Sequence, residues 1–288
     1  MNRTEPAPGA APAPLAIDAL RRARAAARLG RTIHYVDSVD STNTLAHQLA
    51  SEGAAEGTTV IAETQTKGRG RLGRTWVSPP GRNLYLSIIL RPTIAVARAP
   101  QIGLVVGVAV AEAVGDWASP VTIKWPNDVL IDGRKVAGIL TEMDVDGDRI
   151  RCVIVGVGVN LNSTAEDFPP DLRDKAVSVC TAGGAPVDRA AFAEHLLTRL
   201  EERYDRFLNE GFAAIRPLWE RLSALTGQRV QIDDGVRRYQ GIVVGVADDG
   251  TLRLRDAAQG ETHVVAGDVT VVDGYRSGAA GAPRSVGR

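Results

Sequence analysis

The stretch from residue 63 to residue 76 constrains this chain most strongly, because it reads E-T-Q-T-K-G-R-G-R-L-G-R-T-W. In this stretch the glycines Gly68, Gly70 and Gly73 separate four cationic residues, Lys67, Arg69, Arg71 and Arg74. Glycine lets backbone N–H groups approach a ligand closely, and guanidinium groups bind carboxylate and phosphate oxygens with paired hydrogen bonds. Four unpaired cations would repel one another, so we expect a mobile loop that orders around an anionic ligand. A solvated basic loop without a ligand is the simpler alternative.

The glycine spacing also matches G-x-G-x-x-G, the dinucleotide-binding fingerprint. That fingerprint should open a helix whose N-terminus holds a pyrophosphate. Here Trp76 leads instead to a Pro79-Pro80-Gly81 turn and an apolar run over residues 84–90. These features indicate a turn and a strand. We therefore reject the dinucleotide interpretation and predict that the basic loop joins two strands.

Composition limits the classes of protein to which the chain can belong. The 288 residues carry 34 basic and 34 acidic side chains, so no net charge attracts the chain to nucleic acid or membrane. The apolar run from Leu104 to Ala111 is far shorter than the roughly 20 residues that span a bilayer. Cys152 and Cys180 form no C-x-x-C pattern, which argues for a reducing cytoplasm and against a zinc site or a structural disulfide. We expect a soluble, cytoplasmic protein without a signal peptide.

Hydrophobic periodicity predicts an antiparallel meander in the middle of the chain. Asp132-Gly133 and Asp146-Gly147 each lie between apolar runs, and this is a strong hairpin signal. Strands are also predicted at 33–36, 59–63, 83–91 and 150–159, and helices after the polar residues 40–43 and over 98–118, 188–208 and 215–225. From residue 229 short alternating strands at 229–232, 238–246, 251–255, 263–266 and 269–272 predict a small antiparallel barrel.

These patterns divide the chain into four parts. Residues 1–32 are predicted to be a disordered leader followed by a short helix, which covers residues 15–29 and ends at Gly30. Residues 33–226 form the main domain and residues 227–273 the barrel. Residues 274–288 are rich in Gly, Ala, Ser and Arg, cannot bury a core and are predicted to be disordered.

Five motifs occur in order along the main domain. They are Ser41-Thr42-Asn43, Gln65 with the basic loop, Lys124-Trp125-Pro126-Asn127-Asp128, Lys135 beyond a hairpin turn, and Gly156-Val157-Gly158-Val159-Asn160. With these motifs the chain resembles the biotin protein ligases from Ile33 to about Val272. The resemblance implies an α+β catalytic domain of the class II synthetase type, built on a mixed, largely antiparallel sheet, and then an SH3-like barrel. It also implies that biotin and ATP form biotinyl-5′-AMP, from which biotin passes to a lysine of a biotin carboxyl carrier domain of a carboxylase.

The same resemblance implies roles for individual residues. Biotin would be bound by Ser41, Thr42, Asn43, Gln65, Gly68, Arg69, Gly70, Arg71, Lys135, Gly156 and Gly158. ATP would be bound by Arg71, Trp76, Lys124, Asn127, Asp128 and Asn160. Lys135, Arg71 and Asp128 would be catalytic, because cations must offset the repulsion between a carboxylate and a triphosphate. Mg²⁺ is expected together with ATP, although the sequence does not identify its ligands.

Simpler structural roles remain open for several of these motifs. Residues 41–43 are also ordinary helix caps, Lys124 is also a solvated residue at a strand end, and residues 156–160 also suit a tight strand crossing. One departure from the family pattern is Leu72, which stands where an arginine is common. Another is that residues 1–32 are too few for the winged helix-turn-helix of some relatives, so we expect no specific DNA binding.

Two other functions compete with protein biotinylation. A lipoate- or octanoyl-transferring ligase would use the same fold, because a fold alone does not fix the acyl group. A nucleic-acid-binding module would use the basic loop and the barrel without catalysis, but it would need aromatic stacking surfaces and an excess of positive charge. The sequence leaves open whether the protein forms a homodimer.

Overall fold

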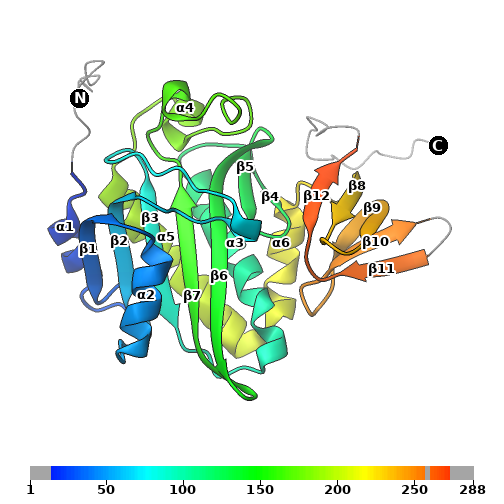
Figure 1. Cartoon of the computed structure of the whole chain (residues 1–288), viewed down its shortest axis with the longest axis horizontal. Helices are drawn as coiled ribbons and strands as arrows, with labels where there is room; N and C mark the ends of the chain where they lie inside the picture. The colour runs from blue at the N-terminus through cyan, green and yellow to red at the C-terminus, as the bar shows by residue number, and fades with distance from the viewer. Residues whose placement is uncertain (1–13, 257–259, 273–288) are drawn as a thin grey trace, which may run out of the picture.

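The computed structural model describes residues 14–256 and 260–272 and contains two β-sheets (Figure 1). The larger sheet has seven strands in the order β1-β2-β3-β7-β6-β5-β4. Their bounds are Ile33–Val39 (β1), Thr59–Gln65 (β2), Leu84–Leu90 (β3), Val121–Lys124 (β4), Asp128–Ile131 (β5), Arg134–Asp146 (β6) and Arg149–Val159 (β7). Strands β1 and β2 are parallel, and the other neighbouring pairs are antiparallel. The predicted mixed, largely antiparallel sheet is confirmed.

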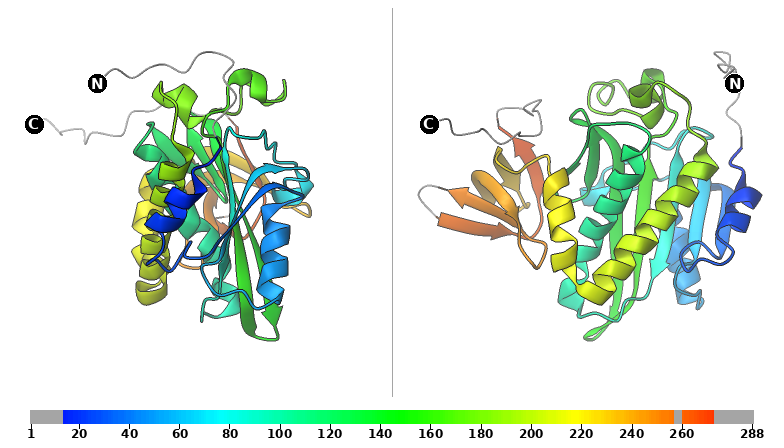
Figure 2. Two further views of the ribbon diagram at one scale, coloured as in Figure 1. Left: turned by 90° about the vertical axis from the view of Figure 1, so that its left-hand side faces the viewer. Right: turned by 180° about the vertical axis from the view of Figure 1, so that it is seen from behind.

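Helices cover both faces of this sheet. Their bounds are Ile17–Ala23 (α1), Thr42–Ser51 (α2), Pro100–Gly115 (α3), Val179–Gly183 (α4), Arg189–Glu210 (α5) and Arg216–Leu222 (α6). Helix α2 packs on one face, where its Ala46 and Ala50 form a small core with Val60, Ile89 and Ile154. Helices α3, α5 and α6 lie on the opposite face, as the view from behind in Figure 2 shows, and form the main core there.

Helix α3 explains an apolar stretch that would otherwise suggest a membrane segment. Residues Val96–Gly115, which include α3, are long and apolar enough by composition to cross a bilayer. However, 67% of the most apolar window is buried inside the protein. Helix α3 contacts α5 on one side and the sheet on the other, so it is the central helix of the main core.

The second sheet contains five antiparallel strands in the order β11-β10-β9-β8-β12. Their bounds are Arg229–Asp233 (β8), Arg238–Val246 (β9), Leu252–Asp256 (β10), Gly260–Val264 (β11) and Asp268–Val271 (β12). This arrangement fits the predicted SH3-like module. Strand β11 begins at Gly260, whereas the sequence predicts a strand at 263–266, because pairing of Gly260 with Asp256 fixes the register of the hairpin.

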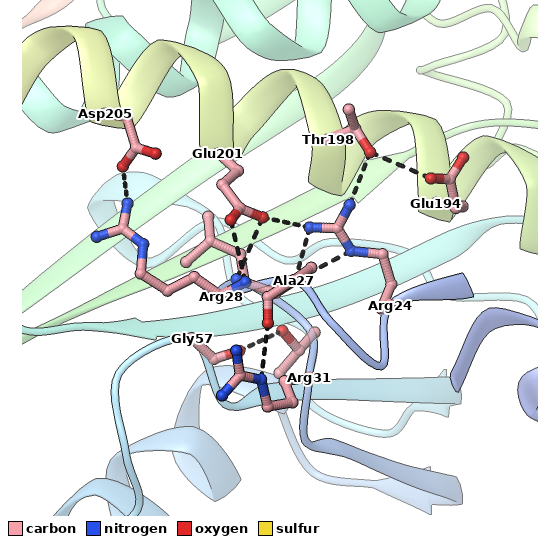
Figure 3. Close-up of polar contacts among 11 residues, drawn as sticks. Arg24, Ala27, Arg28, Arg31, Gly57, Glu194, Thr198, Glu201 and Asp205 are labelled. Atoms are coloured by element: carbon pink, nitrogen blue, oxygen red, sulfur yellow. Dashed lines mark hydrogen bonds and ion pairs between the residues drawn. The ribbon is translucent and has the colours of Figure 1, made fainter. Parts of the chain in front are cut away.

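The N-terminal helix is shorter than predicted, and Figure 3 shows the reason. The expected helix over residues 15–29 ends at Ala23. Beyond it, the buried guanidinium of Arg24 donates to the Leu29 carbonyl, five residues later in the chain, with Nη2 at 2.8 Å. The N–H of Gly30 donates to the Gly57 carbonyl. Arg24 also pairs with Glu201 of α5. Residues 14–31 are therefore fastened to the main domain, while the predicted leader before residue 14 and the predicted C-terminal tail lie outside the described residues.

We predict that Arg24→Met lowers the free energy of unfolding by about 3 kcal/mol, because it removes one partner of a largely buried ion pair. Urea denaturation measures this loss. Arg22→Met is the matched control, since Arg22 is exposed and lies two residues earlier, in α1. We expect that control to stay within about 0.5 kcal/mol of the parent. An equal loss in both variants would contradict the structural role of the Arg24 contacts.

Candidate active site

The basic loop joins β2 to β3, as predicted, and is itself a small hairpin. Arg69 and Thr75 form an antiparallel bridge, and the Gly70 N–H donates to the Arg74 carbonyl at 2.7 Å. Leu72 at φ 56° and Gly73 at φ 72° form the tip of this hairpin. A left-handed Leu72 is costly, whereas Gly73 adopts this conformation without strain.

The arginines of the loop each have a polar partner, so the expectation of an unpaired cluster is wrong for them. Arg69 Nη2 lies 2.9 Å from Glu142 Oε2 on β6. Arg71 Nη1 donates to Asn127 Oδ1 at 3.3 Å. Arg74 pairs with Asp268 at the start of β12. These partners are distant in sequence, so spacing along the chain gave no signal of them.

A cavity of about 580 Å³ lies between this loop and the sheet. The cavity brings together residues from all five sequence motifs. Its lining includes Ser41, Thr42, Asn43, Gln65, Arg69, Gly70, Arg71, Trp76, Lys124, Asn127, Asp128, Lys135, Gly156, Gly158 and Asn160. Gly68 is absent from this lining; it is buried beneath the loop, where a Cβ would lie 2.4 Å from the Trp76 carbonyl oxygen.

A neutral polar network forms the end of the cavity near the start of α2. Gln65 Oε1 accepts hydrogen bonds from the N–H and the hydroxyl of Thr42, at 2.9 and 3.1 Å. Ser87, which is fully buried on β3, lies 2.7 Å from the Thr42 hydroxyl and 2.6 Å from Asn43 Oδ1. Ser41 is the N-cap of α2, yet its side chain makes no capping hydrogen bond. This end of the cavity suits an uncharged ligand with both donors and acceptors.

Two glycines of β7 line the cavity with backbone alone, without side chains that project into it. A Cβ at Gly156 would lie 2.2 Å from Asn43 Oδ1, and one at Gly158 would lie 2.6 Å from Trp76 Cε2. The indole of Trp76 thus packs directly on the backbone of β7. Its ring also lies 5.5 Å from Lys135 Nζ, measured from the ring centroid. Because Trp76 and Asn43 occupy the space of the missing side chains, the glycines allow these two residues to line the cavity.

The other end of the cavity is cationic. Lys135 Nζ pairs with Asp128 Oδ1 at 2.6 Å across the β5–β6 hairpin. Burial lowers the pKa of Lys124 and the pKa of Arg71. Desolvation therefore destabilises both cations, and an anionic ligand would offset this cost. Lys124 is partly buried and lines the cavity, so its position also suits contact with a bound anion.

Asn127 and Asn160 also have structural contacts. Asn127 Nδ2 donates to the Ile139 carbonyl at 2.9 Å, which ties the turn between β4 and β5 to β6. Asn160 is buried, and its Nδ2 lies 3.3 Å from the Val177 carbonyl oxygen. Both residues line the cavity, so each combines a ligand-facing position with a role in holding the backbone.

Four parts of the site belong to none of the sequence motifs. Ser87 joins the neutral network, and Glu142 binds Arg69. Residues 267–269 of the second sheet and a segment before α4 line the cavity, the latter through Phe168, Leu172, Asp174, Lys175 and Ala176. Ser87 is a small polar residue in the otherwise apolar strand β3, and this exception was the signal that could have identified it as part of the site. No signal in the sequence connected Asp268 with the loop, because that contact depends on how the second sheet docks. Trp125 contributes to this docking, with Nε1 3.3 Å from the Gly250 carbonyl oxygen.

The fold and the cavity define a protein ligase domain of the biotin and lipoate class. The family model described as "Biotin/lipoate A/B protein ligase family" matches residues 35–160. The biotin--[acetyl-CoA-carboxylase] ligase of Paracoccus denitrificans is 37% identical over 223 residues, which are 76% of this chain and 92% of that protein. The bifunctional ligase/repressor BirA of Bacillus subtilis is 40% identical over 242 residues, which are 84% of this chain and 74% of that protein.

Solved structures agree with this assignment. The biotin protein ligase from Aquifex aeolicus in complex with biotin and ATP superposes with a TM-score of 0.72 at 30% identity. That match covers 83% of this chain and 98% of the Aquifex chain. This chain belongs to the biotin protein ligase family.

We predict that Gly158→Ala displaces Trp76 and destabilises the protein by about 1–3 kcal/mol, because the new methyl group would overlap the indole. Chemical denaturation measures the loss, and tryptophan emission reports the displacement. Gly115→Ala is the control, since nothing lies within 4 Å of a Cβ at that position. Unchanged stability and emission in Gly158→Ala would show that Trp76 does not depend on the glycine.

Proposed function

We propose that this protein is an ATP-dependent biotin protein ligase that acts in the cytoplasm. It forms biotinyl-5′-AMP from biotin and ATP and then transfers biotin to a lysine of a biotin carboxyl carrier protein or domain. A single observation carries the proposal: one cavity joins a neutral hydrogen-bonding end to a cationic end across the strands β3, β6 and β7. Biotin has a matching asymmetry, with an uncharged ureido ring at one end and a carboxylate at the other.

The neutral end suits the ureido ring. Ser41, Thr42, Asn43 and Gln65 offer hydroxyl and amide groups without a net charge. Of these, Ser41 Oγ has no bond to the helix backbone in its capping position. The ring would lie along the low glycine floor at Gly156 and Gly158, with the valeryl chain directed toward Arg71 and Lys135. Gly70 lines the cavity and lets the loop backbone approach this ligand closely. Gly68 acts indirectly, because its missing side chain leaves room for the Trp76 carbonyl.

The cationic end suits the first chemical step. A carboxylate oxygen of biotin attacks the α-phosphorus of ATP, and the bond from that phosphorus to the bridging oxygen of pyrophosphate breaks. Both reactants are anions, so Arg71, Lys124 and Lys135 lower the barrier by offsetting their charge. Asp128 holds the Lys135 ammonium group at 2.6 Å and so fixes the position of that cation.

The nucleotide would lie beside Trp76, with Asn127 and Asn160 nearby. Mg²⁺ commonly binds through phosphate oxygens and one or two carboxylates. The described residues contain no cluster of three His, Cys, Asp or Glu side chains that would hold a resident metal. Three carboxylates, Asp128, Asp174 and Asp268, do line the cavity. They do not form one cluster, and Asp128 and Asp268 are already paired with Lys135 and Arg74. An ion that arrives with ATP would therefore be held mainly by phosphate oxygens, whose charge it would neutralise.

In the second step the amine of the acceptor lysine attacks the carbonyl carbon of biotinyl-5′-AMP. An amide bond forms, the bond from the carbonyl carbon to the phosphate oxygen breaks, and AMP leaves. The loop of residues 67–76 shields this mixed anhydride from water and from other amines until the carrier protein arrives.

Homodimer formation and the absence of specific DNA binding remain predictions. Sedimentation tests the first, and an electrophoretic shift assay tests the second.

ATP–pyrophosphate exchange tests the proposal directly. We expect exchange that depends on biotin and that lipoate does not support, followed by biotin transfer to a carrier domain. Exchange with lipoate alone would favour the lipoate-type ligase, which the family description includes. An absence of exchange with either acid would overturn the enzymatic proposal.

Lys135→Ala should reduce biotin-dependent exchange by about two orders of magnitude, because a charge-assisted contact to the transferring phosphate contributes about 3 kcal/mol. Its stability should change little, since the Lys135 side chain is 35% exposed. Lys67→Ala is the matched control, because Lys67 is an exposed lysine of the basic loop that does not line the cavity. Near-normal exchange by Lys135→Ala would refute its role.

A further inference from the structure

Glu142 on β6 connects two parts of the site that are far apart in sequence. Its Oε2 accepts a hydrogen bond from Asn43 Nδ2 at 2.6 Å and lies 2.9 Å from Arg69 Nη2. His47 Nε2 of α2 lies 3.8 Å from the same oxygen. Glu142 does not line the main cavity; it borders the neighbouring hollow under the loop, which residues 69–74 and 140–142 form. One carboxylate thus links the loop, the start of α2 and the sheet.

The contact with Asn43 sets the direction of an amide in the neutral network. Asn43 Oδ1 accepts from the Ser87 hydroxyl at 2.6 Å, while Nδ2 donates to Glu142 and faces the Leu140 carbonyl at 3.3 Å. An ionised carboxylate accepts hydrogen bonds and cannot donate them. The amide nitrogen must therefore face Glu142, and the amide oxygen must face Ser87. A reversed amide would place its oxygen against the carboxylate.

The contact with Arg69 separates the roles of the loop arginines. Glu142 compensates the charge of Arg69, whose side chain is 44% exposed. Arg71 is more enclosed: burial lowers its pKa, and its guanidinium donates to the neutral Asn127 in the cavity wall. Arg71 is thus the cation that a bound anion would stabilise. Arg69 is suited to fasten the loop to β6.

We propose that Glu142 is a positioning residue that holds the loop closed over biotinyl-5′-AMP through Arg69 and orients Asn43 beneath the ureido ring. This inference rests on the proposed function. It predicts that Glu142 affects the release of biotinyl-5′-AMP more than the formation of biotinyl-5′-AMP. Loss of the carboxylate charge speeds escape of the intermediate, whereas formation of the intermediate still depends on Arg71 and Lys135, which Glu142 does not touch.

The experiment compares release of the intermediate with its formation. Labelled biotinyl-5′-AMP is formed on each protein, and its loss is followed after dilution into excess unlabelled biotin. We expect Glu142→Gln to release the intermediate about fivefold faster, which corresponds to about 1 kcal/mol for a partly exposed ion pair. The maximal rate of biotin-dependent exchange should stay within about twofold of the parent.

Asp146→Asn is the matched control. Asp146 lies on the same strand and pairs with an arginine, Arg151, at 3.0 Å, but it is outside the cavity and the hollow. It therefore loses the same charge and a similar ion pair. We expect its release rate to equal that of the parent. Equal release by Glu142→Gln and Asp146→Asn would overturn the inference.

A double-mutant cycle tests whether Glu142 acts through Arg69. Arg69→Gln alone and the double variant should each release the intermediate about as fast as Glu142→Gln alone, because each removes the same ion pair. If the increases in release rate of the two single variants multiplied in the double variant, Glu142 would not act through Arg69. Arg69→Gln changes a partly exposed side chain, so it also serves if Glu142→Gln folds poorly.

Glu142→Ala tests the second contact. Glutamine at position 142 still accepts the hydrogen bond from Asn43, but alanine does not, so the KM for biotin should rise further in Glu142→Ala than in Glu142→Gln. Identical KM values in the two variants would overturn the role in orienting Asn43. A parent protein that forms no biotinyl-5′-AMP would overturn the proposed function and this inference with it. A parent that forms the intermediate, with unaltered release from Glu142→Gln, would overturn this inference alone.

Discussion

The buried ion pair between Glu63 and Arg189 is the interaction on which the rest of the site depends. Arg189, the first residue of α5, donates to both carboxylate oxygens of Glu63 at 2.9 and 3.1 Å. The same carboxylate accepts hydrogen bonds from the N–H groups of Leu15 and Gly81 and from the Tyr35 hydroxyl. Burial alone would raise the pKa of Glu63, but the hydrogen bonds from Arg189 and Tyr35 outweigh it and keep the pKa below its usual value. A buried pair of this kind is costly to break from one side, so it fixes one arrangement of the segments that it joins.

Those segments are the ones that place the loop. Glu63 lies at the end of β2, where the loop leaves the sheet, and Gly81 lies where the chain returns toward β3. Both ends of the loop are therefore fixed to a single carboxylate. The two arms of the hairpin are held separately, Arg69 by Glu142 of β6 and Arg74 by Asp268 of the second sheet. A glycine-rich loop would otherwise lose much conformational entropy on ordering, and anchors at both ends reduce that loss.

Local chemistry let the sequence predict much of the fold and most of the candidate site. The hairpin at Asp132-Gly133 has positive φ at both residues, 48° and 73°, as the Asp-Gly signal requires. Alternating apolar residues predicted the strands on both sides of it. The failures occurred where distant side chains act on the backbone. Arg24 ends α1 early because its guanidinium bonds the Leu29 carbonyl and Glu201, and Glu201 is far away along the chain.

The sequence by itself determined which residue types were available: a loop of glycines and cations, a neutral helix start, a lysine beyond a hairpin turn and a strand with two glycines. It also determined the family, because these motifs occur in a specific order. The tertiary structure alone decided how the charges are paired. Ion pairs act over a few ångströms, and the partners of Arg69 and Arg74 come from β6 and β12. Only the folded arrangement of the sheets therefore distinguishes Arg71, whose partner in the cavity wall is neutral, from the two arginines that carboxylates hold in place.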